Sequence, residues 1–375
     1  MRDAKCIALL DAALSIFLIG PMVVFYWRGT WQVMDAYLMP ESEGSSAWVS
    51  LGVGLLVPLT AYLSQHHLDL YLAQKSPWPV FAVLSRVYTA VYAFGTVSHW
   101  RGTWKLLDYY TGTGWQSATV SVVVGLVGLG ALRSIVNIGA PPFFVKLDLP
   151  ERFFVSPTQF RQKSFDVRLD SVPQWAGHFD YGYILDCVFS VVVPESLVVF
   201  VWRGGWEILD AVFYPGCDRC TAWLSLAVGY GVTLVAFCVQ VPVSHMSLAS
   251  MGVRKHVIED IFSVWNFFGA LNIWRGVWMT LDAYLLPDDP ALSNIITHSM
   301  ALVITILMYC GNTLIVRGVY HDAELPAGKG CLFDTRYLRT VVVKEERDVQ
   351  LRMNSADSFE KGKNNEEQLD DEGYL

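Results

Sequence analysis

The fold of this chain is decided by a short stretch that reads Trp27-Arg28-Gly29-Thr30-Trp31-Gln32-Val33-Met34-Asp35. Its pattern, Trp-Arg-Gly-x-Trp-x-x-x-Asp, returns three times along the chain. The later copies consist of Trp100, Arg101, Gly102, Trp104 and Asp108; Trp202, Arg203, Gly204, Trp206 and Asp210; and Trp274, Arg275, Gly276, Trp278 and Asp282. Such a recurrence indicates an internal repeat, and a repeat sets the architecture of a chain.

The composition places this repeat in a membrane. Of the 375 residues, 53% are hydrophobic and only 17% are charged, whereas a soluble protein carries about a quarter charged residues. The apolar residues form separate runs of about the 20 residues that a helix needs to cross a bilayer. We predict eight spans at approximately Cys6–Trp27, Ala47–Ser64, Pro79–Trp100, Ser117–Ile138, Asp180–Trp202, Thr221–Val243, Val257–Trp274 and Leu292–Val316.

The predicted fold is an all-α, polytopic bundle of four two-helix repeats. Each repeat has an even number of spans, so all four insert in the same sense, unlike the inverted repeats of many transporters. The chain divides into a first membrane half (1–138), a cytoplasmic linker (139–179), a second membrane half (180–316) and a largely disordered cytoplasmic tail (317–375), in which Leu338–Val343 could form a short strand. Lys and Arg gather before the first span, in the linker and in the tail. This distribution predicts that both termini are cytoplasmic and that the motif loops lie on the opposite side.

Within the motif, the two Trp and the Asp fall on one side of a helix. Arg and Asp are about two helical turns apart, so an Arg could reach its own Asp or that of a neighbouring repeat. The Gly favours a helix break or a close helix contact, and the Trp side chains suit the interfacial aromatic belt. Two interpretations remain open: a structural latch between repeats, or a ring of Arg and Asp that lines an ion-binding vestibule.

Other charges fall within predicted spans, where each would cost about 2.5–3.5 kcal/mol at a helix centre and should therefore face the bundle or water. These residues are Asp11, Arg86, Asp186, Glu195, Glu259 and Asp260. They lie in the odd-numbered spans, which we expect inside the bundle, whereas the even-numbered spans are clean apolar runs expected toward lipid. An Arg86–carboxylate pair and a proton or cation path both remain open.

The remaining sequence features point to few partners. Cys217 and Cys220 could form a disulfide in an outer loop, and without a second ligand pair they do not suggest a zinc site. We find no enzyme motif, no cofactor or metal site, and no basic patch typical of nucleic-acid binding. The expected surroundings are a lipid bilayer.

The four Trp-Arg-Gly elements, the eight predicted spans and the long central loop resemble the fuseless family of animal membrane proteins, over about residues 6–320. The resemblance implies an eight-pass neuronal protein of the presynaptic plasma membrane, needed for neurotransmitter release and for the placement of voltage-gated calcium channels. Expected partners would be such a channel or a presynaptic scaffold protein. The alternative is an ion channel or transporter whose pathway is lined by the intramembrane acids and the repeated Arg and Asp.

Overall fold

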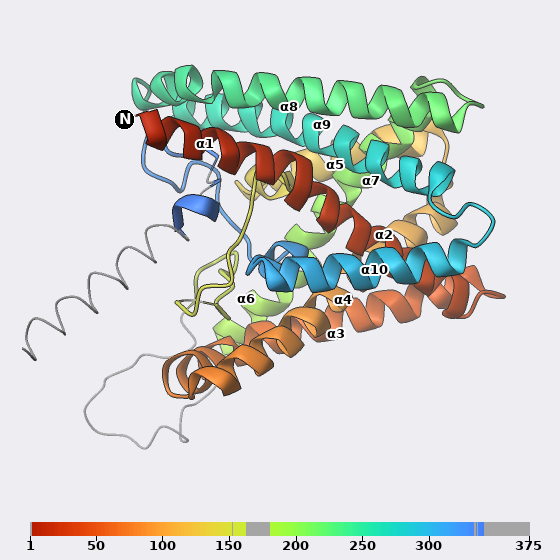
Figure 1. Cartoon of the computed structure of the whole chain (residues 1–375), viewed down its shortest axis with the longest axis horizontal. Helices are drawn as coiled ribbons and strands as arrows, with labels where there is room; N and C mark the ends of the chain where they lie inside the picture. The colour runs from red at the N-terminus through yellow and green to blue at the C-terminus, as the bar shows by residue number, and fades with distance from the viewer. Residues whose placement is uncertain (1, 152, 163–180, 334, 336, 341–375) are drawn as a thin grey trace, which may run out of the picture. The chain divides into compact units, whose positions relative to one another are not determined.

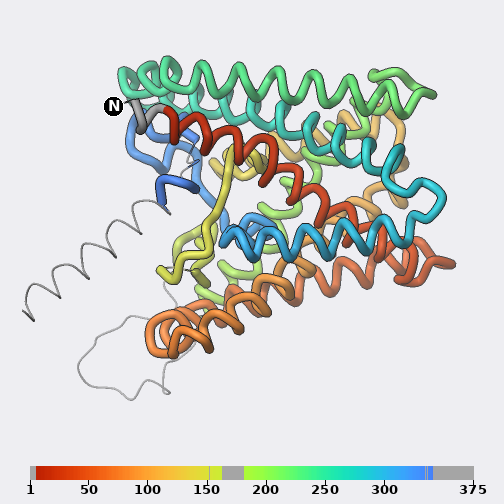
Figure 2. The backbone as a smooth tube through the Cα atoms, in the orientation of Figure 1, coloured from red at the N-terminus to blue at the C-terminus, as the bar shows by residue number. Residues whose placement is uncertain are grey.

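The computed structural model describes residues 2–151, 153–162, 181–333, 335 and 337–340. These residues are helical or irregular, and none of them forms a strand. The chain divides into two compact units, one of residues 15–334 and one of the terminal segments 1–14 and 335–375. Figures 1 and 2 trace the helices of the larger unit.

Each copy of the motif lies inside a continuous helix of the larger unit, toward its C-terminal end, so the motif glycine does not break any of them. In chain order the elements are η1 (Ser15–Ile19), α2 (Gly20–Tyr37), α3 (Glu43–Leu68), η2 (Asp69–Gln74), α4 (Trp78–Thr111), α5 (Trp115–Ala131), η3 (Ile135–Ile138), α6 (Tyr181–Val192), α7 (Pro194–Val212), α8 (Asp218–Leu248), α9 (Val253–Tyr284), α10 (Pro290–Leu307) and η4 (Gly311–Leu314).

The four motif helices, α2, α4, α7 and α9, contact one another in a closed order in which α9 returns to α2. Each also packs extensively along one outer helix: α4 on α3, α7 on α5, α9 on α8, and α2 on the last helix, α10 (Figure 1). In three of these pairs the outer helix precedes the motif helix in the chain, directly for α8–α9, with η2 between for α3–α4, and with η3 and α6 between for α5–α7. Because α2 pairs with α10, the bundle closes end to end.

Six helical segments of the described chain are long and apolar enough to cross a membrane: Cys6–Tyr37, Glu43–Gln74, Trp78–Thr111, Tyr181–Val212, Asp218–Leu248 and Pro290–Leu307. The three with motif copies are 44–50% buried in their most apolar window, against 39% for Glu43–Gln74 and 28% for Asp218–Leu248 and Pro290–Leu307. Motif helices thus lie inside and less buried helices outside, as predicted. Trp115–Ala131 is apolar but shorter, and α9 falls outside the six, so the count of eight spans stays a prediction.

The chain that follows each membrane half folds back onto the bundle. In the predicted linker, Phe143, Phe153 and Phe154 are almost fully buried. Asp148 of this linker accepts hydrogen bonds from the backbone N–H groups of Gly311 (3.0 Å) and Asn312 (2.8 Å) at the start of η4. Residues 163–179 of the linker lie outside the described residues.

The segment after η4 makes an equivalent contact with η3 of the first half. Asp322, which follows η4, accepts hydrogen bonds from the backbone N–H groups of Ile135 (3.0 Å) and Val136 (2.8 Å) at the start of η3. Burial raises the pKa of both Asp148 and Asp322, although these backbone donors oppose that shift. The two halves are therefore joined by reciprocal caps, each supplied by the segment after the other half.

The smaller unit contains α1 (Arg2–Leu14) and a helical turn over residues 337–340. This turn replaces the first part of the strand expected at Leu338–Val343, because the carboxylate of Asp11 accepts the backbone N–H groups of Leu338 (2.5 Å) and Arg339 (3.5 Å). Asp11 is 1% exposed. The rest of that strand and the tail expected to be disordered, residues 341–375, lie outside the described residues.

Candidate functional site

The tryptophans of the four motif copies form two square arrangements, which we call the first and second tetrads. The first tetrad contains Trp27, Trp100, Trp202 and Trp274. Its neighbouring ring centroids are 5.0–5.7 Å apart and edge-to-face. The second tetrad contains Trp31, Trp104, Trp206 and Trp278, with edge-to-face neighbours at 5.6–6.0 Å. These separations are those of aromatic rings in direct contact, so each tetrad is a closed ring of side chains.

The first tetrad corrects one sequence interpretation. Its members are 2–6% exposed, so they lie in the core and not in an interfacial aromatic belt. Their indole N–H groups are used as well: Trp27 donates to the carbonyl of Leu314 (3.0 Å) and Trp274 to that of Pro141 (2.9 Å). Trp202 donates to the Ile138 carbonyl at 3.0 Å. Three of the four tryptophans are therefore bonded to the last residues of η3 and η4 or to the chain just after η3.

The arginine of each motif copy forms an ion pair with the aspartate of the preceding copy, and the first copy pairs with the last. The pairs are Arg28–Asp282 (2.7 Å), Arg101–Asp35 (2.8 Å), Arg203–Asp108 (2.7 Å) and Arg275–Asp210. The arginine side chains are only 0–2% exposed, whereas the aspartates are 20–42% exposed. Of the two pairings that the sequence left open, the structure has the one between repeats.

Each buried guanidinium also binds hydroxyl groups of the outer helix on which its own helix packs. These hydroxyls belong to Ser293 and Thr297 for Arg28, Ser46 and Ser50 for Arg101, Ser117 and Ser121 for Arg203, and Ser225 for Arg275. These hydroxyls were not predicted, because the even-numbered spans are otherwise clean apolar runs. The signal was a Ser or Thr pair four residues apart, followed after four more by Gly54, Gly125, Gly229 or Ala301.

The motif glycine permits this packing. A Cβ built on Gly29, Gly102, Gly204 or Gly276 would lie less than 3.0 Å from backbone atoms of the outer helix. Real Cβ atoms do not approach so closely, so a side chain there would push the two helices apart. Of the two roles expected for this glycine, the structure therefore uses the close helix contact.

The hydroxyl contacts give a first prediction. Ser225→Ala should lower the free energy of unfolding by about 1.5–3 kcal/mol, because it removes a hydrogen bond to a buried charge. Ser225 is fully buried and bonds Nη1 of Arg275 at 2.6 Å. Denaturant titration of the purified chain in micelles measures the change. Ser45→Ala, at an exposed position, is the control and should stay within about 0.5 kcal/mol of the wild type; an equal effect of both changes would contradict the assignment.

The other charges of the predicted spans are held by separate sets of polar partners. Arg86 pairs with Asp148 at 2.8 Å. This is the Arg86–carboxylate pair that the sequence left open beside a proton or cation path. Asp186 accepts from the Thr158 hydroxyl (2.6 Å) and the Phe160 backbone N–H (2.9 Å). These partners of both residues come from the linker, far away in the sequence, so the sequence did not reveal them.

Three acids of the second half complete this set. Glu195 accepts from the hydroxyl of Tyr62 (2.9 Å), with Nδ1 of His99 at 3.6 Å. Glu259 accepts from the hydroxyl of Ser247 at 2.6 Å, and Asp260 is partly buried beside it in α9. The described contacts do not link these acids into one chain of hydrogen bonds.

Two smaller expectations concern cysteines and metals. Cys217 and Cys220 form a disulfide in the structure. Within the described ranges, no group of three or more His, Cys, Asp and Glu side chains is placed to hold a metal ion.

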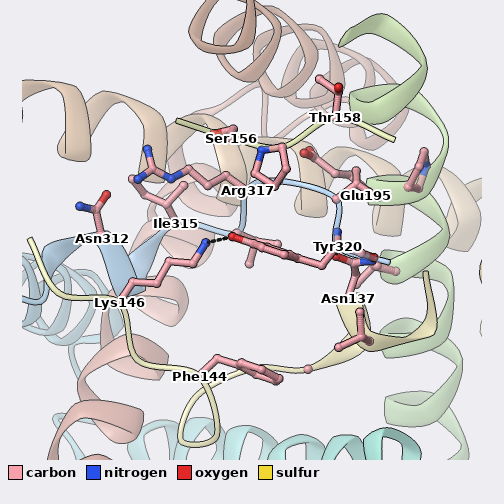
Figure 3. Close-up of a pocket in the computed structure, with 18 of the residues that line it drawn as sticks. Asn137, Phe144, Lys146, Ser156, Thr158, Glu195, Asn312, Ile315, Arg317 and Tyr320 are labelled. Atoms are coloured by element: carbon pink, nitrogen blue, oxygen red, sulfur yellow. Dashed lines mark hydrogen bonds between the residues drawn. The ribbon is translucent and has the colours of Figure 1, made fainter. Parts of the chain in front are cut away.

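A cavity of about 910 Å³, here called the chamber, lies against the first tetrad. Figure 3 shows part of its wall, with Phe144, Lys146, Arg317 and Tyr320 labelled. All four tryptophans of the first tetrad line it, and none of the second tetrad does. The rest of its wall comes largely from the segments after η3 and η4, including Phe144, Lys146, Arg317 and Tyr320. The tetrad therefore closes one end of the chamber.

Comparison with known proteins gives one match. The model of the Fuseless family matches residues 6–315 of the 375-residue chain, which includes all four motif copies. No curated protein and no solved structure matches the chain.

Proposed function

Because the chain belongs to the Fuseless family, we propose that it is a presynaptic organiser, a multi-pass protein that supports the placement of voltage-gated calcium channels and neurotransmitter release. Its membrane-spanning helices and its family fit an integral membrane protein, and the family suggests a neuronal one. In this proposal the chain is not an enzyme. The presynaptic plasma membrane is its site of action, and its termini and linker face the cytoplasm.

The observation that supports an organiser over a channel is the pair of closed tryptophan tetrads between the four motif helices. Neighbouring rings touch edge to face in both tetrads, at centroid separations of 5.0–6.0 Å. The motif arginines are 0–2% exposed and bound to aspartates and hydroxyls. Such a centre suits a rigid scaffold, because an ion pathway needs water or polar ligands along its axis. We assign the motif the role of a latch that ties the repeats together.

The proposal is tested by rescue in neurons that lack this chain. Wild-type protein should restore calcium-channel density at release sites and evoked transmitter release. A chain truncated after residue 340 tests whether the charged tail carries the interaction. Truncation that reaches the membrane normally but fails to restore channel density would support docking through the tail. Restoration of release without any change in channel density would overturn the proposed role in channel placement.

The organiser proposal and the channel alternative make opposite predictions in a bilayer. The organiser proposal predicts that the purified full chain passes no current above that of empty membranes, because the tetrads close the centre of the motif helices. The channel alternative predicts a current. Asp11→Asn/Asp186→Asn serves as the companion variant, since it removes two buried acids. A wild-type current that differs from the current of this variant would show that the protein is a channel or transporter. It would refute the proposal of an organiser that conducts no ions.

A further inference from the structure

The chamber has the size and wall of a ligand site. Its volume of about 910 Å³ falls within the range of small-molecule pockets, about 300–1,000 Å³, which combine apolar walls with a few polar groups. The indole rings of the first tetrad form its closed end. Val198, Ile315 and Val316 extend the apolar surface from there along the wall.

Two cationic side chains of this wall have no carboxylate partner among the described residues. Arg317 is 6% exposed, and its guanidinium contacts only neutral groups among the described residues. These are the hydroxyl of Tyr88 (3.3 Å), the carbonyl of Phe153, and the rings of Tyr88, Tyr92 and Phe153, whose centroids lie 5.9–6.0 Å from Cζ. Its Nε has no hydrogen-bond partner. Lys146 bonds the hydroxyl of Tyr320 at 3.0 Å. A buried charge without a counter-ion is costly, so Arg317 favours an anion from outside the chain, and the half-buried Lys146 adds a second positive charge to the same wall.

The other charged groups of the wall are one more cation, Arg161, and three carboxylates. Arg161 pairs with Glu324 at 2.7 Å, Glu195 accepts from Tyr62 and lies near His99, and Asp69 accepts from the side-chain amide of Gln74 at 3.0 Å. None of these three carboxylates forms an ion pair with Lys146 or Arg317 in the described part of the chain.

The ionisation of Tyr320 reports the same positive field. Burial alone would raise the pKa of this phenol, but Lys146, Arg317 and Arg161 together lower the pKa below its ordinary value. Figure 3 shows the Lys146–Tyr320 hydrogen bond across the middle of the view, with Arg317 and Asn312 nearby. The buried Oδ1 of Asn312 also has no hydrogen-bond partner, so unpaired polar atoms gather at this part of the wall.

We propose that the chamber binds an anionic amphiphile with a single alkyl chain, whose acidic head lies at Lys146 and Arg317 and whose chain lies against the first tryptophan tetrad. A carboxylate or phosphate head would accept charge-assisted hydrogen bonds from the ammonium and guanidinium groups. The alkyl chain would cover the apolar wall, and each CH₂ group buried there would contribute about 0.8 kcal/mol to the free energy of binding. This proposal does not depend on the presynaptic role.

The test titrates oleate into the purified full chain in a non-ionic detergent and reads the dissociation constant from tryptophan fluorescence and native mass spectrometry. Oleate should bind, and methyl oleate, which keeps the chain but loses the charge, should bind at least about tenfold more weakly, since one charge-assisted hydrogen bond is worth about that factor. Lys146→Gln and Arg317→Gln should each weaken oleate binding by a similar factor. Lys329→Gln is the matched control, because Lys329 is exposed and lies outside the chamber wall, and it should leave the dissociation constant unchanged.

Folding is checked by the thermal unfolding midpoint of each variant. Because Arg317 also holds the Phe153 carbonyl, Lys146→Gln keeps the proposal testable if Arg317→Gln does not fold. Equal affinity for oleate and methyl oleate would overturn the proposal, and so would an unchanged dissociation constant in Lys146→Gln. Inorganic phosphate that competes with oleate at equal affinity would show a site for free anions and would refute an amphiphile site.

Discussion

Asp108→Ala should lower the free energy of unfolding by about 3 kcal/mol. The change leaves the side chain of Arg203, which is 0% exposed, with neutral acceptors only, namely Ser117, Ser121 and the carbonyl of Gly112. Removal of one partner of a buried ion pair costs about 3–5 kcal/mol. We expect the lower end because Asp108 is 20% exposed and water can enter in its place. Denaturant titration of the purified chain in micelles gives the value, and folded yield should fall with it.

The exposure of the other motif aspartates predicts how their replacements rank in loss of stability. Asp282 and Asp210 are 41% and 42% exposed, so their replacement by Ala should cost less than that of Asp108. Arg101→Ala should also lower folded yield, because Arg101 binds Asp35 as well as Ser46 and Ser50. Glu41→Ala, at an exposed position, is the control and should change stability by less than about 0.5 kcal/mol. Wild-type yield and trafficking for both Arg101→Ala and Asp108→Ala would rule out the latch.

Gly102→Ala should destabilise the fold by about 3 kcal/mol, the upper end for an overpacked contact. The added Cβ would meet the backbone of Leu51 on α3 at less than 3.0 Å, and a backbone cannot turn away as a side chain can. The axes of α3 and α4 would have to separate, which would also lengthen the bonds from Arg101 to the hydroxyls of α3. Thermal unfolding in micelles measures the effect.

Gly52→Ala is the matched control. Gly52 lies on α3, the outer helix that Gly102 contacts, and nothing lies within 4 Å of a Cβ added at Gly52. Alanine has a higher helix propensity than glycine by about 1 kcal/mol, so this variant should be neutral or more stable. Equal losses at Gly52 and Gly102 would mean that glycine replacement is costly even without a close helix contact, and would refute a special role for the contact between Gly102 and α3.

The sequence predicted the features that depend on local periodicity. Long apolar runs predicted the helices, the recurrent motif predicted equivalent repeats, and the charges of the odd-numbered spans predicted that these spans lie inside the bundle. The sequence also predicted that the motif glycine would either break a helix or allow a close contact. The sequence did not choose between Arg101 reaching Asp35 or Asp108, because both lie within its reach and only the packing of the repeats separates them.

Other features depended on contacts between segments far apart in the chain. Asp148 and Asp322 cap each other's half through backbone groups, and backbone donors leave no mark in a sequence. The first tetrad was placed at the membrane interface because a lone Trp at a span end suits that position, whereas four of them fill the space between the motif helices. The hydroxyls at Ser50 and Ser121 were overlooked because single serines are unremarkable in membrane helices.

The central claim is that each motif arginine is paired with the preceding repeat, and two double-mutant cycles at Arg101 test it most directly. One combines Arg101→Ala with Asp35→Ala, and the other combines Arg101→Ala with Asp108→Ala. Residues in one ion pair couple by about 0.5–3 kcal/mol, whereas independent residues are additive within about 0.5 kcal/mol. The account predicts coupling in the Arg101/Asp35 cycle and additivity in the Arg101/Asp108 cycle. Coupling to Asp108 with additivity at Asp35 would show that each arginine binds within its own motif copy and would contradict the closed ring.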